Sequence, residues 1–469
     1  MLPINAHPEL ASNATRQAGV SGVVSAEPEQ LSICAKVVAV SLLAGGRHLF
    51  DPAQATRTSS RSETANRSPK DQSPSAPMKY WYRVSPTVGD TFGSADAALG
   101  WETFVQYMPH FESDIAAMHT EYQSLLHRDR WSLRALFSTD DCDIAEYCDT
   151  FAPNRFGAEA CEAVETFCRR HRIWLESGGA AYNSMTPYLH PRTIDLPRMT
   201  TIGVYNAILF ALNDTVGREK FSHLSEDERA QAQREVDHLC RLFESGRIRP
   251  DNPTPIVAAS LEFLTILTEQ AEPVWLQRFR ASTIDHLRSA IRDQNVGARG
   301  DLLSVDDYIA LRNEVSGMYP AIQLCEFARD TTLPWEQLAA AGLAEDLRTL
   351  ERLTAEVGAL MNDVFSFEKE VIVDRSDFNL ISILLLNTPG ATLADAVLGA
   401  AQIVRERFTH FRELRQDLLA RCAGLGPPLA TAVTAYADDL DQCVQASWVW
   451  QCATSRYKGR SIFAEAHHT

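Results

Sequence analysis

Apolar residues recur every three or four positions through most of this chain, and that spacing constrains its fold more than any other feature. A 3.6-residue repeat places such residues on one face of an α-helix. The repeat covers residues 102–136, 157–176, 203–221, 228–244, 256–270, 273–292, 305–328, 335–371, 378–386, 393–422 and 428–457. Alternating β-branched runs are nearly absent, and most prolines and glycines fall between these segments. The sequence therefore predicts an all-α protein with many helices and short connections.

The beginning of the chain has a different composition. Residues 54–77 are rich in Ser, Thr, Pro and Arg and almost without large apolar side chains. Such a stretch cannot bury enough surface to offset the entropy lost on ordering. We therefore expect a mostly disordered extension at 1–78, a helical N-terminal segment at 79–140 and the main helical domain at 141–469.

The net charge and the cysteine pattern indicate which binding partners are unfavourable and in which cellular compartment the protein is expected. The formal net charge of −17 argues against nucleic acid or an anionic membrane as the main partner. The ten cysteines include no C-x-x-C pair, which is typical of reduced thiols in a cytoplasmic protein. The best apolar run, at 31–45, contains Lys36 and falls short of the roughly 20 residues that span a bilayer. We expect no stable membrane insertion, and the sequence leaves monomer and homodimer open.

One short segment carries a chemical signature. Residues 362–370 read NDVFSFEKE, so Asn362, Ser366 and Glu370 are spaced i, i+4, i+8 and fall in one stripe of a helix. An amide oxygen, a hydroxyl and a carboxylate form a hard ligand set that suits Mg²⁺. Lys369 stands beside the last ligand, where it could reach an anion held by the metal.

Other elements stand at fixed distances from this segment. Arg312 lies 50 residues before Asn362 and is followed by Gly317, a glycine inside a helical pattern that costs about 1 kcal/mol against alanine. A helix break at Gly317 would turn a backbone carbonyl toward a cavity. The pair Arg456-Tyr457 lies 94 residues after Asn362 and follows an aromatic stretch.

Two acidic motifs could supply further metal ligands. One is Asp140-Asp141-Cys142-Asp143, which starts 222 residues before Asn362. The other is Asp214 with Glu219, at the end of an apolar run and 148 residues before Asn362. Asn213 could take the first position of the second motif.

In this order, the elements resemble class I terpene synthases, most closely the microbial single-domain type, over about residues 145–460. The family's spacing favours Asp214 over Asp140 and Asp141. The resemblance departs from the family at Thr215, where a second aspartate is usual, and at Asn313, where a second arginine is common. It implies a class I terpenoid synthase helical bundle around a central active-site cavity.

The resemblance also implies a reaction. A Mg²⁺-dependent cyclase would ionise an isoprenyl diphosphate, release diphosphate and cyclise the carbocation. The implied substrate is farnesyl diphosphate, giving a sesquiterpene, with three Mg²⁺ ions. The alternatives are a diterpene synthase acting on geranylgeranyl diphosphate and an inactive cyclase-like helical protein. Product skeleton and a hydrocarbon or alcohol ending are not encoded in any motif.

Residue roles follow from the same resemblance. The metal ligands would be Asp214, Glu219, Asn362, Ser366 and Glu370, and the diphosphate and catalytic groups would be Arg312, Gly317, Lys369, Arg456 and Tyr457. Aromatic faces can stabilise a carbocation, and the candidates for that role are Phe210, Phe365, Trp448 and Trp450. Asn379 follows the metal motif as a structural asparagine does in this family.

Overall fold

The computed structural model describes residues 111–467, apart from 112, 222, 247–252 and 423. The extension predicted at 1–78, with its apolar run at 31–45, lies outside the described residues, as does most of the segment predicted at 79–140. The described residues contain no β-strand, only isolated bridges, so the predicted all-α class is confirmed. None of the described helices is long and apolar enough to cross a membrane.

The helices follow the predicted periodicity closely. Residues 113–125 are helical, and the next helices are α3 (Leu133–Phe137), α4 (Ile144–Tyr147), α5 (Gly157–His171), α6 (Gly179–Asn183), α7 (Thr186–Leu189), α8 (Leu196–Val216), α9 (Arg218–Phe221), α10 (Glu226–Ser245), α11 (Pro255–Gln270) and α12 (Pro273–Ala290). The second half contains α13 (Val296–Arg299), α14 (Val305–Val315), α15 (Met318–Ala328), α16 (Trp335–Ala340), α17 (Ala344–Phe365), the π-helical turn η1 (Glu368–Val373), α18 (Leu380–Asn387), α19 (Leu393–Cys422), α20 (Pro427–Ala453) and the 3₁₀ turn η2 (Ser455–Tyr457).

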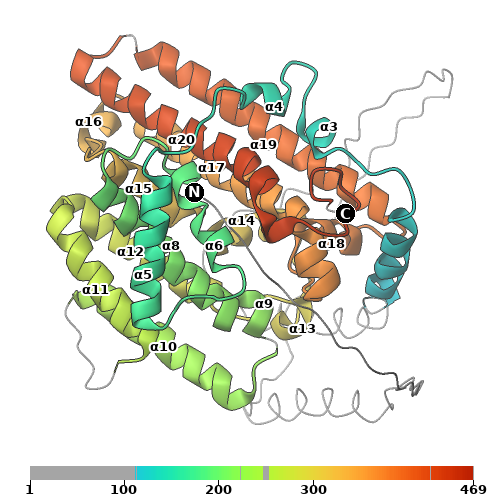
Figure 1. The fold of residues 1–469 in the computed structure, drawn as a ribbon. Coiled ribbons are helices and arrows are strands. Elements are labelled where there is room, and N and C mark those ends of the chain that lie inside the picture. Colours follow the sequence, from blue (N-terminus) through green and yellow to red (C-terminus); the bar gives the residue numbers. More distant parts are fainter. Residues whose placement is uncertain (1–110, 112, 222, 247–252, 423, 468–469) are drawn as a thin grey trace, which may run out of the picture. The chain divides into compact units, whose positions relative to one another are not determined.

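Helix α17 lies at the centre of the bundle. It packs against α14, α15, α18, α19 and α20, and Figure 1 shows α19 and α20 running side by side next to it. From residue 353 to 367 every residue except Asn362 is buried. A helix that is apolar all round has to be surrounded by other helices. The segment 362–370, predicted to hold a metal, therefore begins on the largely buried part of α17.

A glycine lets α17 approach its neighbours closely. A Cβ atom at Gly358 would lie 2.7 Å from Met318 Cε on α15 and 3.1 Å from Ser447 Oγ on α20. Both distances are shorter than ordinary carbon contacts. Gly358 thus keeps three helices close together beside the cavity described below.

The first half of α17 carries a half-buried carboxyl group, Glu351. Burial raises the pKa of Glu351 to about 7; the hydrogen bond from Tyr436 and the charges of Arg278 and Arg348 lower it, and Glu326 raises it. Tyr436 donates its hydroxyl to Glu351 Oε1 at 2.5 Å. We therefore expect this side chain to make a pH-dependent contribution to the stability of the bundle near neutrality.

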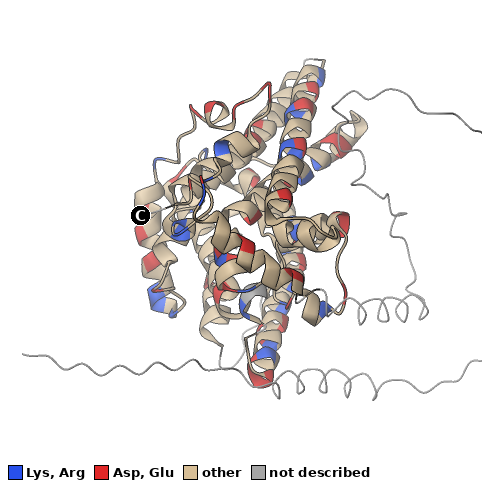
Figure 2. Ribbon diagram, turned by 90° about the vertical axis from the view of Figure 1, so that its right-hand side faces the viewer, with Lys and Arg blue, Asp and Glu red and all other residues tan. Residues whose placement is uncertain are grey.

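Residues 113–137, which belong to the segment predicted at 79–140, pack into the same core as α17. Met118, Tyr122, Leu125, Leu133 and Phe137 are buried members of the hydrophobic cluster that also contains the interior of α17. Figure 2 shows acidic and basic residues of both signs spread along the same helices. All cysteines of the described residues are free thiols.

Candidate active site

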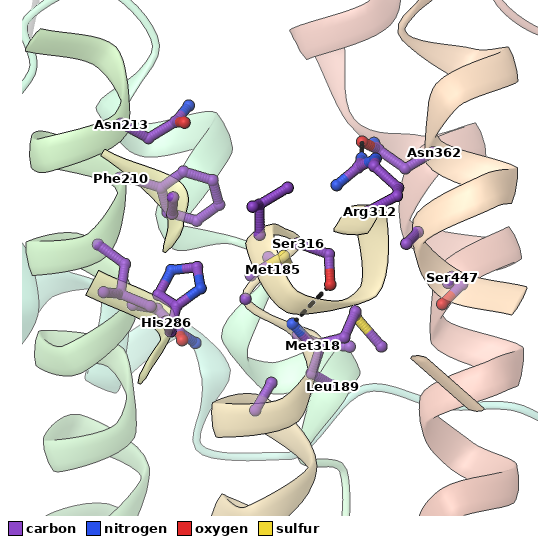
Figure 3. Close-up of a pocket in the computed structure, with 18 of the residues that line it drawn as sticks. Met185, Leu189, Phe210, Asn213, His286, Arg312, Ser316, Met318, Asn362 and Ser447 are labelled. Carbon is purple, nitrogen blue, oxygen red and sulfur yellow. Dashed lines mark hydrogen bonds between the residues drawn. The ribbon is translucent and has the colours of Figure 1, made fainter. Parts of the chain in front are cut away.

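A cavity lies between α8, α12, α17, α20 and the junction of α14 with α15. Its volume is about 170 Å³, on a scale where one water needs roughly 10–15 Å³, so it is far larger than a packing void. Its polar lining includes Asn213, Arg312, Asn362, Glu370, Arg456 and Tyr457, and its apolar lining includes Met185, Leu189, Phe210, Met318, Ala321 and Trp450. Figure 3 shows Asn213 and Asn362 on facing helices at one end, with Met185, Leu189 and Met318 farther in.

The helix break predicted at Gly317 is present. Gly317 has a φ of +77°, in the left-handed region that favours glycine, and it is the N-cap of α15. Ser316 holds the break, because its Oγ donates to Asn313 O at 3.0 Å and accepts from Met318 N at 3.1 Å. The Gly317 carbonyl accepts from Ala321 N at 3.2 Å as part of α15. Gly317 itself is among the residues that line the cavity, so a role for it toward a bound ligand stays a prediction.

Arg312 and Asn313 have different surroundings. The Arg312 side chain lines the cavity, and its Nη2 donates to Asn362 Oδ1 at 3.1 Å. Asn313 instead donates from Nδ2 to Glu356 Oε1 at 3.3 Å. Only Arg312 is therefore positioned to meet a ligand in the cavity.

Asp363 holds Arg312 in place, and the sequence analysis gave this residue no role. Arg312 Nε donates to Asp363 Oδ1 at 2.7 Å, and the two side chains are 3% and 0% exposed. The other oxygen, Oδ2, accepts from Tyr308 Oη at 2.6 Å and from Leu380 N at 3.2 Å. The signal in the sequence was an acidic residue in an otherwise apolar stretch, which has to be paired when it is buried.

Asn379 has the structural role that was predicted for it. Its side chain accepts from Ile381 N at 3.1 Å and so caps α18, while its Nδ2 donates to Asp363 O at 2.8 Å. This asparagine joins the start of α18 to the backbone of the metal motif.

The segment 362–370 is not one uniform α-helix, contrary to our expectation. Helix α17 ends at Phe365, and a π-helical turn follows from Glu368. The one-turn spacing survives in the backbone, because Ser366 N donates to Asn362 O and Glu370 N donates to Ser366 O, both at 2.8 Å. Single π-helical turns inside helices are frequent at functional sites.

Lys369 and Glu370 take different directions from this turn. Glu370 is buried and lines the cavity. Lys369 Nζ lies 3.2 Å from Asp374 Oδ2, and Lys220 Nζ lies 3.3 Å from Asp374 Oδ1. Lys369 is therefore ion-paired with a neighbouring carboxylate.

The acidic motif on α8 is held by an aromatic and a cationic partner. Tyr182, on α6, donates its hydroxyl to Asp214 Oδ2, and Arg456 Nη1 lies 3.7 Å from the same oxygen. Asn213 lines the cavity directly. Asp214 is not among the lining residues, but it is paired with Arg456, which is. Glu219 belongs to α9, but its side chain lies outside the described part of the structure.

The rival motif at 140–143 is at a different place and has other partners. Asp141 accepts from Thr139 Oγ1 at 2.7 Å and at 2.5 Å from Arg412 Nη2. Asp143 caps α4. Asp140 is exposed. None of these three carboxylates is among the cavity's lining residues.

Arg456 and Tyr457 close the polar end of the cavity. The guanidinium carbon of Arg456 lies 4.1 Å from the centre of the Tyr182 ring and 5.7 Å from that of Phe210. Tyr457 Oη accepts from Asn362 Nδ2 at 2.8 Å. Burial raises the pKa of Tyr182 to about 12; Arg456 lowers it, and the hydrogen bond to Asp214 raises it. Tyr182 therefore stays protonated and keeps donating to Asp214 at neutral pH.

The aromatic candidates divide between cavity and core. Phe210 and Trp450 line the cavity. Trp448 instead packs against Phe137 and Phe365, with ring centres 6.3 and 5.9 Å apart. The expectation that Phe365 and Trp448 could face a carbocation is therefore wrong, because both belong to the aromatic core between α3, α17 and α20. His286, which the sequence analysis did not select, also lines the cavity and bonds through Nδ1 with Glu314 O at 3.3 Å.

A family model and several curated relatives match this chain. The model, described as terpene synthase family 2, C-terminal metal binding, covers residues 205–410. Sesquiterpene synthase 1 of Postia placenta is 28% identical over 196 residues, which are 42% of this chain and 55% of the relative. Silphinene synthase of Penicillium patulum is 26% identical over 244 residues, which are 50% of this chain and 62% of the relative. The chain thus matches somewhat more than half the length of these relatives.

Solved structures share the fold. A-eudesmol synthase superimposes with a TM-score of 0.55 at 18% identity, over 65% of this chain and 96% of that one. The linalool/nerolidol synthase of Streptomyces clavuligerus, solved with 2-fluorogeranyl diphosphate, gives 0.53 at 18% identity, over 64% of this chain and all of that one. The architecture is therefore the class I terpenoid synthase bundle. Together with the family model and the relatives, it supports a class I terpene synthase, the family that the sequence motifs resemble.

Proposed function

We propose that the protein is a Mg²⁺-dependent terpene cyclase that ionises farnesyl diphosphate and cyclises the resulting cation to a sesquiterpene. The observation that carries the proposal is a single cavity with Arg312, Asn362, Glu370, Arg456 and Tyr457 among its polar lining and an apolar interior. The names of the curated relatives, among them sesquiterpene synthases 1 and 2 of Postia placenta, favour a fifteen-carbon substrate.

The polar end suits a diphosphate group. Arg312 and Arg456 are cations whose side chains are only 3% and 6% exposed. A guanidinium presents a rigid fork of donors that matches phosphate oxygens. Tyr457 adds a hydroxyl, and Lys369 stands one residue before Glu370. In our proposal these groups bind the leaving group and orient the allylic carbon toward the apolar interior.

The donor set fits a hard divalent cation. Ser366 Oγ is fully buried and has no hydrogen-bond partner among the described atoms, as expected of an oxygen reserved for a ligand. With Asn362 and Glu370 it would hold Mg²⁺, and Asp214, with Glu219, would hold further ions, three in all. Bound there, Mg²⁺ would neutralise the charge that develops on the departing diphosphate.

Arg312 is the residue most affected by cation binding. Its Nη2 now donates to Asn362 Oδ1, the oxygen expected to face the metal. Because a guanidinium and a metal ion repel each other, we expect this bond to be exchanged for one to a diphosphate oxygen when ligand binds. Its Nε bond to Asp363 can persist through the exchange.

The apolar interior suits a carbocation. Phe210 and Trp450 offer ring faces, each worth about 0.5–2 kcal/mol to a cation. Met185, Leu189, Met318 and Ala321 exclude water from the same space. These residues would let the isoprenyl cation fold and cyclise before water can react with it.

The test is diphosphate release from ten-, fifteen- and twenty-carbon isoprenyl diphosphates with Mg²⁺, followed by gas chromatography of the extract. We expect turnover with the fifteen-carbon substrate and none after chelation. Glu370→Gln and Asn362→Leu should abolish turnover while the far-ultraviolet circular dichroism spectrum stays unchanged. Release that survives chelation would contradict the mechanism, and turnover of the twenty-carbon substrate alone would replace the proposed substrate by geranylgeranyl diphosphate.

A further inference from the structure

The chain after α20 carries Arg456 and Tyr457 on a short turn and then runs without a helix to the end of the described residues. Terminal segments of this kind stay ordered only when other parts of the protein hold them. The position of two proposed diphosphate ligands therefore depends on what holds residues 458–467, which we call the tail.

One contact that holds the tail in place comes from the segment 362–370. Glu368, two residues from both Ser366 and Glu370, accepts through Oε1 from Ser461 Oγ at 2.8 Å and from Ile462 N at 3.0 Å. Hydrogen bonds to a carboxylate are stronger than those between neutral groups. The tail is thus fixed to the same turn that carries the proposed metal ligand Glu370.

The tail is also held by residues 131–134, which lie in the segment predicted at 79–140. Glu465, on the tail, accepts through Oε1 from Ser132 Oγ at 2.8 Å and Arg134 N at 3.0 Å, and through Oε2 from Leu133 N at 2.8 Å. One tail carboxylate therefore satisfies the free donors at the start of α3. These partners are more than 330 residues apart in sequence.

Backbone pairing and packing complete this contact. Trp131 N donates to Ile462 O at 3.0 Å, and Ala464 N donates to Trp131 O at 2.8 Å. Phe463 is fully buried, with its ring centre 6.3 Å from that of Trp131. Tyr122 donates its hydroxyl to Arg460 O at 3.0 Å. The tail is thus paired with the backbone of Trp131 and anchored by a buried aromatic side chain.

We propose that Glu465 is a positioning residue: by fastening the tail to residues 131–134, it holds Arg456 and Tyr457 at the mouth of the cavity. Residues 131–134 thereby help to position the diphosphate site without touching the ligand. The proposal rests on the proposed function for its catalytic consequence, whereas the attachment of the tail can be measured independently of any activity.

The test compares full-length Glu465→Ala with Glu413→Ala, an exposed glutamate on α19. Hydrogen exchange at the Ile462 and Ala464 amides should become faster only in Glu465→Ala. The same variant should lose about 10- to 100-fold in kcat/KM for farnesyl diphosphate, the scale expected of a roughly 1 Å misplacement. Glu465→Gln keeps one oxygen acceptor and should fall between the two, which provides a folded variant if the alanine protein is unstable.

A further variant separates positioning from general destabilisation. If Glu465 acts through Arg456, then Glu465→Ala should cost much less kcat/KM in an Arg456→Lys background than in the wild type, since coupled residues are not additive. The proposal would be overturned if the losses in kcat/KM from Glu465→Ala and Arg456→Lys were fully additive. It would also be overturned if Glu465→Ala left hydrogen exchange in the tail unchanged, or made it faster without changing kcat/KM. A wild-type protein that releases no diphosphate would refute the proposed function instead, and the exchange data would still report whether Glu465 holds the tail.

Discussion

Replacing Asp363 by asparagine tests whether a buried ion pair orders the polar end of the cavity. Asp363 is fully buried, and its carboxylate accepts from Arg312 Nε at 2.7 Å, Tyr308 Oη at 2.6 Å and Leu380 N at 3.2 Å. Asparagine has the same shape, but it carries no charge and turns one oxygen acceptor into an NH₂ donor. At least one of the three donors then faces another donor, and the Arg312 charge loses its counter-ion.

The cost follows from these contacts. Breaking a buried pair by removing one charge costs about 3–5 kcal/mol, of which a single buried donor without a partner accounts for about 1–3 kcal/mol. We therefore expect Asp363→Asn to lower the free energy of unfolding by about 3–5 kcal/mol. Turnover of the folded fraction should also fall, because Arg312 is no longer held.

Urea unfolding followed by circular dichroism at pH 7 measures the loss. The matched control is Asp417→Asn, which removes one carboxylate of the Arg421–Asp417 pair, whose side chains are 40% and 62% exposed, and should cost under about 1 kcal/mol. In an Arg312→Met background, Asp363→Asn should cost about 0.5–3 kcal/mol less than in the wild type. Equal costs for Asp363→Asn and Asp417→Asn would refute the buried-pair argument.

Three further predictions concern other groups. Asp214→Asn should lower turnover by about 10²-fold or more, the scale of one lost electrostatic contact to the transition state, while Asp140→Asn with Asp141→Asn should cost little; steady-state kinetics giving the reverse order would mean that the wrong acidic motif was chosen. Tyr182→Phe, which removes the hydroxyl donated to Asp214, should raise the Mg²⁺ concentration for half-maximal activity by about 10-fold or more, and an unchanged Mg²⁺ titration would contradict this role. The pKa of Glu351 is raised to about 7 by burial, so its contribution to stability is full below the ordinary glutamate pKa and is lost as pH rises through about 7; Glu351→Gln should therefore lose less stability than wild type between pH 5 and 8 in thermal unfolding scans.

The sequence by itself determined the features that depend on local geometry. Periodic apolar residues predict helices because a helix repeats every 3.6 residues whatever surrounds it. Gly317 predicts a break because a positive φ suits glycine in any fold, and the structure has that break. The order and spacing of Asp214, Arg312, Asn362 and Arg456-Tyr457 resemble those of class I terpene synthases, and such a resemblance can be read along the chain without knowing its fold.

Only the tertiary structure decided which way the buried residues face. Residues 353–367 are all buried except Asn362, so the spacing of apolar residues cannot distinguish the side that faces the cavity from the side that faces the core. Phe365 could therefore be predicted as buried but not assigned to the core. Asp363 was visible in the sequence, but its partners Tyr308 and Leu380 are 55 and 17 residues away.

Contacts between distant segments were equally hidden from the sequence. Nothing in the composition of residues 131–134 indicates that they hold the tail, because Ser132, Leu133 and Arg134 read as an ordinary helix start. Their partner Glu465 is 331 to 333 residues further along the chain. A single sequence records propensities over one or two helical turns. The pairing of residues 131–134 with the tail is instead set by how the bundle packs, so the position of Arg456 and Tyr457 could be determined only from the folded chain.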